Sequence, residues 1–155
     1  MTEFKLPEPK VFDPKDPNPC SGCSHCCEYI AFEIDTPQNV KDFRRLTQDL
    51  LHQNVWVYVD DENMWHLQFN TPCDKLLNQR CDYYTYRPNV CRDYAPEECS
   101  RYGDGKEALY LFRSPEHLYQ YLAVKRPVLF DQLDRLTSIP FSKKVLQTTS
   151  KAYVF

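Results

Sequence analysis

The residues of this 155-residue sequence best suited to chemistry are its eight cysteines, four of which fall within eight positions. Cys20, Cys23, Cys26 and Cys27 occur in the stretch CSGCSHCC. A two-residue spacer lets the chain turn back, so that both sulfurs of a CxxC pair can face one ion, as in zinc knuckles and many iron–sulfur loops. Side chains of adjacent residues diverge in most backbone conformations. We therefore expect Cys26 and Cys27 to serve different sites, or one of them to bridge two metals.

The other four cysteines are spaced more widely, at intervals of eight, ten and eight positions. They are Cys73, Cys81, Cys91 and Cys99. No pair among them is a CxxC, so they can close a site only through tertiary folding. We predict that all eight cysteines ligate metal, with the loop at 20–27 completed by sulfurs from 73–99. Two separate four-sulfur sites and one polynuclear cluster with bridging thiolates both stay open.

The choice of metal follows from the thiolate donors. Thiolate-rich sites suit zinc, cuprous copper and iron–sulfur clusters. Zinc is the first choice, because closed four-cysteine zinc sites are common structural staples. An iron or iron–sulfur centre is the alternative, since Cys20, Cys23 and Cys26 also satisfy the C-x2-C-x2-C spacing of such clusters. His25 lies inside the loop, but with eight thiols no imidazole ligand is needed.

Other uses of the cysteines are less consistent with the sequence. Polar residues separate the cysteines of the loop, which disfavours a buried core segment. A disulfide framework needs an exported protein, yet the first 19 residues are charged and proline-rich, without the apolar core of a signal peptide. We therefore expect a cytosolic, cytoplasmic protein. A thioredoxin-type CxxC needs a βαβ unit, and no such pattern follows Cys20.

Composition narrows the range of partners. A net charge of -3 and a pI of about 5.8 give no electrostatic reason to expect binding to nucleic acid or to an anionic membrane. No apolar run is long enough to span a bilayer, and three glycines leave no room for a glycine-rich phosphate loop. No catalytic constellation can be identified, so enzymatic activity stays open. The expected partners are metal ions, with any protein partner unidentified.

The pattern of apolar and turn-forming residues predicts a small α+β domain with few short strands, two or three helices and much loop. Residues 1–19 should be an extended proline-rich arm, 20–136 a single metal-stapled domain, and 137–155 a weakly structured tail. The helix at 37–52 should start with Thr36 as N-cap and Pro37 in its first turn. The expected elements are a strand at 28–34 with Ile30, Phe32 and Ile34 on one face, a helix at about 37–52, strands at 55–59 and 64–69, loops and turns over 70–102, a strand at 108–113, and helices at 115–125 and 127–136.

Charged residues near the second cysteine group have a physical rationale. A divalent ion with four thiolates carries a net charge near -2, which is costly to bury without donors or cations around it. Arg87 and Arg92 flank Cys91, so we expect at least one of them to donate to a sulfur or to neutralise the cluster. The three histidines outside the loop are interpreted as structural: His52, His66 and His117.

The two cysteine groups together resemble the CxxCxxCC proteins, also called the YkgJ-like family of zinc- or iron-chelating proteins. The resemblance spans roughly residues 18–100 and departs from the family pattern at Leu76-Leu77, one position late, and at Gln79-Arg80, where a glycine turn is usual. It implies metal chelation without a defined activity. Three functions stay open: a metal-stapled protein, an iron–sulfur redox or accessory enzyme component, and a metal-delivery protein. The matching residues are Cys20, Cys23, Cys26, Cys27, Cys73, Cys81, Tyr84, Arg87, Pro88, Cys91 and Arg92.

Overall fold

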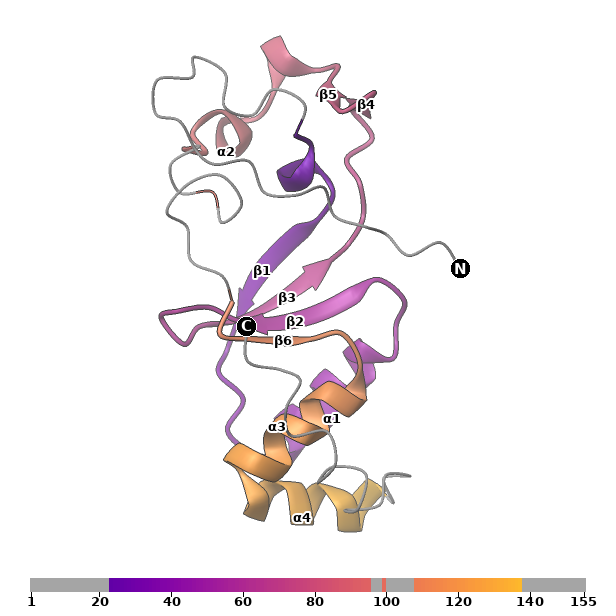
Figure 1. The fold of residues 1–155 in the computed structure, drawn as a ribbon, viewed down its shortest axis with the longest axis vertical. Coiled ribbons are helices and arrows are strands. Elements are labelled where there is room, and N and C mark those ends of the chain that lie inside the picture. The colour runs from indigo at the N-terminus through magenta and orange to yellow at the C-terminus, as the bar shows by residue number, and fades with distance from the viewer. Residues whose placement is uncertain (1–22, 96–98, 100–107, 138–155) are drawn as a thin grey trace.

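The computed structural model describes residues 23–95, 99 and 108–137. The expected arm at 1–19 lies outside those residues, as does all but the first residue of the expected tail. The described chain places its cysteine-rich segments at one end, a small sheet in the middle and three helices at the other end (Figure 1). This mixture of helices and short strands confirms the predicted α+β class. No helix of the described ranges combines the length and apolar character needed to cross a membrane.

The central sheet is antiparallel, with the strand order β1-β3-β2-β6. All four predicted strands are present, three of them shorter than expected. The connection between β2 and β3 is tight because Asp60 accepts hydrogen bonds from the backbone N–H groups of Glu62 (3.0 Å) and Met64 (2.9 Å). Asn63 takes the left-handed conformation that this turn requires. The strands are β1 (Ile30–Ile34), β2 (Val55–Val59), β3 (Trp65–Phe69) and β6 (Tyr110–Phe112).

Helix α1 (Val40–Leu50) starts later than the sequence predicted. Its N-cap is Asn39, and the expected start at Thr36 and Pro37 is wrong. The Asn39 side chain accepts from the backbone N–H of Asp42 (3.2 Å), and the Asp42 carboxylate accepts from the backbone N–H of Asn39 (3.2 Å). This reciprocal capping box pairs two backbone N–H groups that would otherwise lack partners. A start at Thr36 and Pro37 would pair only one, through the Thr36 hydroxyl.

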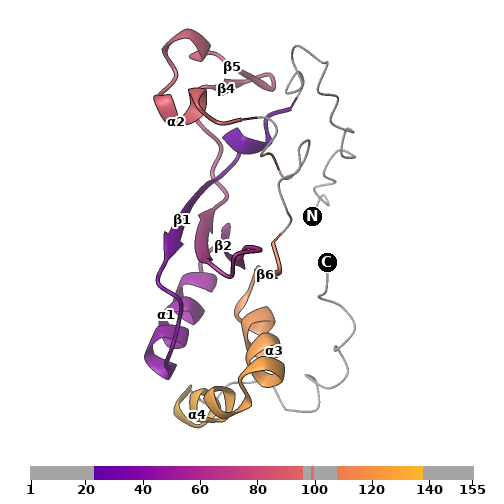
Figure 2. The same ribbon diagram turned by 90° about the vertical axis from the view of Figure 1, so that its left-hand side faces the viewer.

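Two further helices, α3 (Pro115–Lys125) and α4 (Pro127–Thr137), lie close to the predicted positions. Each begins with a proline, whose fixed φ and missing N–H suit the first helical turn. Arg126 separates them and donates its backbone N–H to the Leu122 carbonyl (2.8 Å). Figure 2 shows α3 descending from β6 and α4 turning across the lower end of the molecule.

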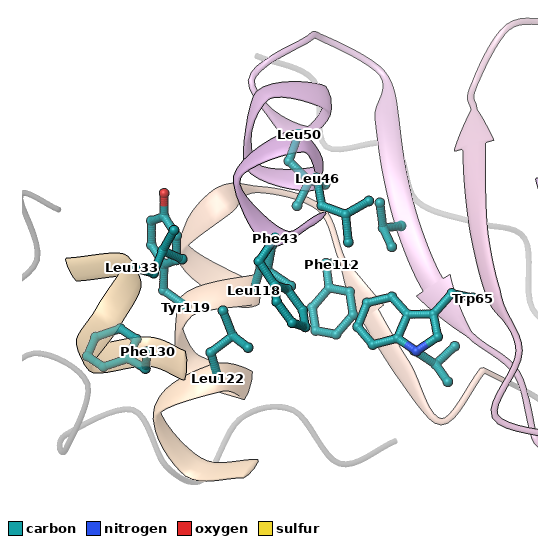
Figure 3. Close-up of a cluster of buried hydrophobic side chains, with 12 residues drawn as sticks. Phe43, Leu46, Leu50, Trp65, Phe112, Leu118, Tyr119, Leu122, Phe130 and Leu133 are labelled. Carbon is teal, nitrogen blue, oxygen red and sulfur yellow. The ribbon is translucent and has the colours of Figure 1, made fainter. Parts of the chain in front are cut away.

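The hydrophobic core lies between the helices and one face of the sheet (Figure 3). The Trp65 ring stacks on Phe112 with centroids 5.6 Å apart, and Phe43 meets Trp65 edge to face at 6.1 Å. The core contains residues from α1, β2, β3, β6, α3 and α4, and none of its members is a cysteine. Its members are Phe43, Leu46, Leu50, Val57, Val59, Trp65, Phe112, Leu118, Tyr119, Leu122, Phe130 and Leu133.

The other end of the molecule, which we call the cysteine lobe, comprises residues 23–29, 70–95 and 99. Only loops and turns were predicted for 70–102, but the lobe also contains short strands and short helices. The helical elements η1, η2 and α2 have no buried residue. Apolar burial therefore stabilises the lobe far less than the sheet and helices. Its elements are η1 (His25–Cys27), β4 (Leu76–Leu77), β5 (Arg80–Cys81), η2 (Tyr84–Tyr86) and the four-residue helix α2 (Asn89–Arg92).

Candidate metal centre

The described part of the CxxCxxCC loop forms a single tight turn. In η1 the backbone N–H of Cys27 donates to the Ser24 carbonyl at 2.8 Å, and that of Glu28 donates to the His25 carbonyl at 3.1 Å. The Ser24 hydroxyl also donates to the Glu28 carboxylate at 2.6 Å. These bonds fix the backbone at Cys26 and Cys27 immediately before β1 begins. Cys20 lies outside the described residues, and Cys23 is partly exposed.

The register of the sheet brings the second cysteine group to this loop. Ile30, the first residue of β1, pairs with Phe69, the last residue of β3. The segment before β1 and the segment after β3 therefore leave the sheet side by side. The backbone N–H of Cys73 donates to the Cys27 carbonyl at 2.7 Å. Sheet pairing thus places the first downstream cysteine beside the loop.

Cys81 is positioned by the β4–β5 hairpin. It lies opposite Leu76, and its neighbour Asp82 donates a backbone hydrogen bond to the Lys75 carbonyl at 2.8 Å. The two turn residues, Asn78 and Gln79, have φ values of 51° and 60°. Two consecutive left-handed residues are the mark of a type I′ hairpin turn. The turn therefore forms without the glycine that is usual in the family pattern.

Cys91 lies on helix α2 and is exposed. Pro88 precedes this helix, and its carbonyl accepts the backbone N–H of Cys91 at 3.0 Å. The guanidinium of Arg87 lies 3.8 Å from the centre of the Tyr84 ring, and Arg92 donates to the Arg87 carbonyl at 3.2 Å. These contacts hold the turn that carries Cys91. They give no support to the expected bond from an arginine to a sulfur.

Four thiols form one electrostatic neighbourhood. Burial raises the pKa of the Cys27 thiol, and the nearby thiols of Cys73, Cys81 and Cys91 raise that pKa further. A hydrogen bond with the Cys26 side chain acts in the opposite direction. The three downstream cysteines are therefore near enough to Cys27 to disfavour a negative charge on its sulfur.

Cys26 belongs to a different neighbourhood, which includes Cys99. Burial raises the pKa of Tyr29, with additional contributions from Cys26 and Cys99. Burial likewise raises the pKa of Tyr94, followed by the charge of Cys99 and a hydrogen bond with its side chain. Cys99 is the most buried of the described cysteines, with 8% of its surface exposed. The adjacent thiols of Cys26 and Cys27 are therefore hydrogen-bonded to each other but differ in their other neighbours.

Tyr29 and Tyr94 are residues of this site that the sequence analysis did not identify. Their proximity in sequence to Cys27 and Cys91 was the available signal. His25 lies near the Tyr29 ring, with centroids 5.3 Å apart, and its Nδ1 is 4.0 Å from the Glu28 carboxylate. Two histidines outside the loop have protein partners: His66 bonds Asp60 at 2.8 Å, and His117 Nδ1 accepts the backbone N–H of Arg113 at 3.2 Å.

The described donor set suits a soft or borderline metal, because its donors are thiols. None of the seven cysteines in the described chain forms a disulfide. At the same time, no three His, Cys, Asp or Glu side chains within these residues are close enough together to hold an ion. The thiols are thus neighbours rather than a closed coordination shell. Chain segments that supply metal ligands commonly close only when the ion binds.

A small α+β protein with its cysteines gathered at one end is the class that this fold defines. A family model, CxxCxxCC, matches residues 19–112, which is more than half of the chain; its description is "Putative zinc- or iron-chelating domain". The chain therefore belongs to the CxxCxxCC family, as its resemblance to that family predicted. The comparisons with curated proteins and with solved structures found no match.

Proposed function

We propose that this protein binds zinc or iron through its eight cysteines, and that the ion completes the folding of the cysteine lobe. The observation that carries the proposal is the 2.7 Å backbone hydrogen bond from Cys73 to Cys27, which joins the two cysteine groups; the influence of Cys81 and Cys91 on the pKa of the Cys27 thiol supports the same grouping. These four residues are the proposed ligands of a first ion. Four thiolates around one ion are the donor set of a closed zinc site.

The remaining cysteines are proposed to contribute to a second centre. Cys26 and Cys99 both lie near Tyr29 and Tyr94, and Cys26 is also hydrogen-bonded to Cys27 of the first group. Cys20 and Cys23 are the two cysteines that remain, and with them the proposed second centre has four ligands. The Tyr94 hydroxyl, which bonds the Cys99 side chain, supplies a donor to a sulfur that carries negative charge. We place the protein in the cytosol, where thiols stay reduced.

Zinc is the favoured metal, and an iron–sulfur cluster is the alternative. When bound, zinc supplies structural cross-linking, whereas an iron–sulfur cluster adds electron transfer. The visible absorption spectrum of protein purified without oxygen decides between them. A colourless protein containing zinc supports the first, and a brown protein that dithionite bleaches supports the second.

A second candidate function is metal delivery, and one observation favours it. Cys26, Cys73 and Cys91 are exposed, although a purely structural site would bury its sulfurs. Exposed thiolates can exchange an ion with a chelator or an acceptor protein. Transfer of bound zinc to a chromophoric chelator within seconds would favour delivery, and retention for hours would favour a structural role.

The ligand set is tested by comparing the metal content of one serine variant and one control variant with that of the wild type. Cys27→Ser removes the thiol common to the first group, so the metal content should fall by about one ion per chain. Ser24→Ala is the matched control, because it alters the same turn without removing a sulfur. Equal metal content in Cys27→Ser and wild type would contradict the proposed first site.

A further inference from the structure

Strand β1 is an outer strand of the sheet. Within the described ranges it pairs with β3 alone, and Figure 2 shows it at the edge. An outer strand has backbone N–H and C=O groups on its second side that can pair with another strand. The opposite outer strand, β6, has only three residues, whereas β1 has five. β1 is therefore the longer of the two edges available for pairing.

The apolar face of β1 is only partly covered. Ile30 and Phe32 lie opposite Phe69 and Leu67, on the face of the sheet that carries the core. Ile34, at the end of the strand nearest the helices, packs against that core. Ile30 is nevertheless 50% exposed and Phe32 55% exposed. The sequence analysis placed these side chains on one face, and the structure leaves two of the three largely open to solvent.

A hollow beside the strand extends this apolar surface. It has a volume of about 430 Å³ and lies between the sheet and the end of α1. Phe69 lines the hollow and meets Phe32 edge to face, with ring centroids 6.3 Å apart. The apolar side of the hollow, formed by Val55, Leu67 and Phe69, thus continues the open side chains of β1, whereas Asp49, His52 and Gln53 line its polar side. Exposed apolar surface of this kind marks interaction sites.

The sequence of β1, Ile-Ala-Phe-Glu-Ile, suits pairing with a second copy of itself. A twofold axis through Phe32 would set Ile30 opposite Ile34 of the second copy and Phe32 opposite its own equivalent. Ala31 would lie opposite Glu33. All five residues of the strand would be paired, and the apolar side chains of both copies would share one face.

Charges favour this register over its neighbours. Beyond the strand ends it sets Asp35 opposite Tyr29 and Glu28 opposite Thr36, so no two carboxylates face each other. Moving the axis to Glu33 would place two carboxylates directly opposite, which destabilises a strand pair. Moving it to Ala31 would leave Ile34 opposite Glu28. The register through Phe32 pairs the most residues with complementary neighbours.

We propose that the protein forms a twofold symmetric dimer in which the two β1 strands pair antiparallel about Phe32. The dimer joins two four-stranded sheets into one of eight strands. In this dimer the exposed Ile30 of each copy lies beside Ile34 of the second copy. Ile34 already packs against the core of its own chain. The contact is isologous, because the same surface serves both copies. It does not depend on bound metal.

Light scattering of the full-length protein after size exclusion tests the dimer. The wild type should have twice the 18.5 kDa mass of one chain at protein concentrations of about 1–100 μM. Phe32→Lys and Phe32→Glu should each be monomeric, because residue 32 faces its own equivalent. An equimolar mixture of the two variants should recover the dimer. Val124→Lys, at a position 69% exposed on α3, is the matched control and should stay dimeric.

Several outcomes would overturn the proposal. They are a wild type with the mass of one chain, variants at position 32 that dimerise as well as the wild type, and a mixture that stays monomeric. If either charged variant lost its near-ultraviolet circular dichroism, Ile30→Lys would replace it and should weaken the dimer at least tenfold. Unchanged metal content in the monomeric variants would separate this result from the proposed metal site.

Discussion

The backbone N–H of Cys73 donates a 2.7 Å hydrogen bond to the carbonyl oxygen of Cys27, which joins the two cysteine groups of the sequence. Neither residue lies in a strand: Cys27 comes shortly before β1, and Cys73 comes shortly after β3. The pairing of Ile30 with Phe69 determines that the two segments leave the sheet together. The position of the candidate metal centre is therefore a consequence of sheet register, which apolar packing fixes without any metal.

The two ends of the molecule should respond differently to metal removal. A chelator should leave the core around Trp65 intact, because apolar contacts stabilise it, and should loosen the cysteine lobe, which has little apolar burial. Limited proteolysis with and without chelator, followed by mass spectrometry, locates the new cuts. We expect them within residues 70–95. Cuts within 115–137 at the same rate would contradict this division.

A core substitution should destabilise the helical end strongly. Leu118 is fully buried, so Leu118→Ala should lower the free energy of unfolding by about 2–5 kcal/mol. Val128→Ala, at a position 70% exposed, should change it by less than about 0.5 kcal/mol. Urea unfolding followed by tryptophan fluorescence measures both. Similar losses in the two variants would show that the core is placed wrongly.

The hairpin that carries Cys81 stores strain at Gln79. A non-glycine residue with a φ of 60° is disfavoured, so Gln79→Gly should stabilise the hairpin by about 1 kcal/mol. Amide exchange of Asp82, whose N–H bonds the Lys75 carbonyl, should slow by about fivefold. Asn78→Gly is the control. It should stabilise the hairpin less than Gln79→Gly does, because asparagine tolerates the left-handed conformation better than glutamine. Faster exchange in Gln79→Gly would count against the type I′ turn.

The β2–β3 turn should contribute stability that depends on pH. Burial acts to raise the pKa of Asp60, but hydrogen bonds from His66 and from the backbone N–H groups of Met64 and Glu62 lower it overall. A carboxyl with a lowered folded-state pKa contributes stability above its unfolded pKa of about 3.9, and loses it as pH falls through the folded value. Asp60→Asn should therefore cost about 1 kcal/mol at pH 7.

The difference between wild type and Asp60→Asn should narrow as the pH falls below about 3.9, in urea unfolding measured at several pH values. Comparing the two proteins at each pH cancels titrations that they share. Glu62→Gln keeps the same backbone donor and serves as the control, with little change expected at any pH. A gap that stays constant or widens in acid would rule out this role for Asp60.

Local sequence signals predicted most elements of the sheet and helices. Ser114-Pro115 and Pro127 identified the starts of α3 and α4, because proline is favourable in a first helical turn. The start of α1 was wrong, since the stronger capping box at Asn39 and Asp42 outcompetes Thr36. Periodicity also placed Ile30 and Phe32 on one face. It could not indicate that the helices leave that face half exposed, which depends on tertiary packing.

The candidate site was less accessible to sequence analysis. Cysteine spacing identified the ligand candidates, and the family match supports metal chelation. Spacing alone could not assign Cys27 to the neighbourhood of Cys73, because that relationship depends on the sheet register. It also could not identify Tyr29 and Tyr94 beside Cys26 and Cys99. Assignment of each ligand to an ion stays a prediction.

Metal analysis of the full-length protein, purified without oxygen, tests the central claim most directly. Elemental analysis of the folded protein should find more than one equivalent of zinc or iron per chain, because eight cysteines provide ligands for two four-sulfur centres. A folded protein that contains no metal, and that takes up none when zinc or ferrous iron is added under reducing conditions, would contradict it.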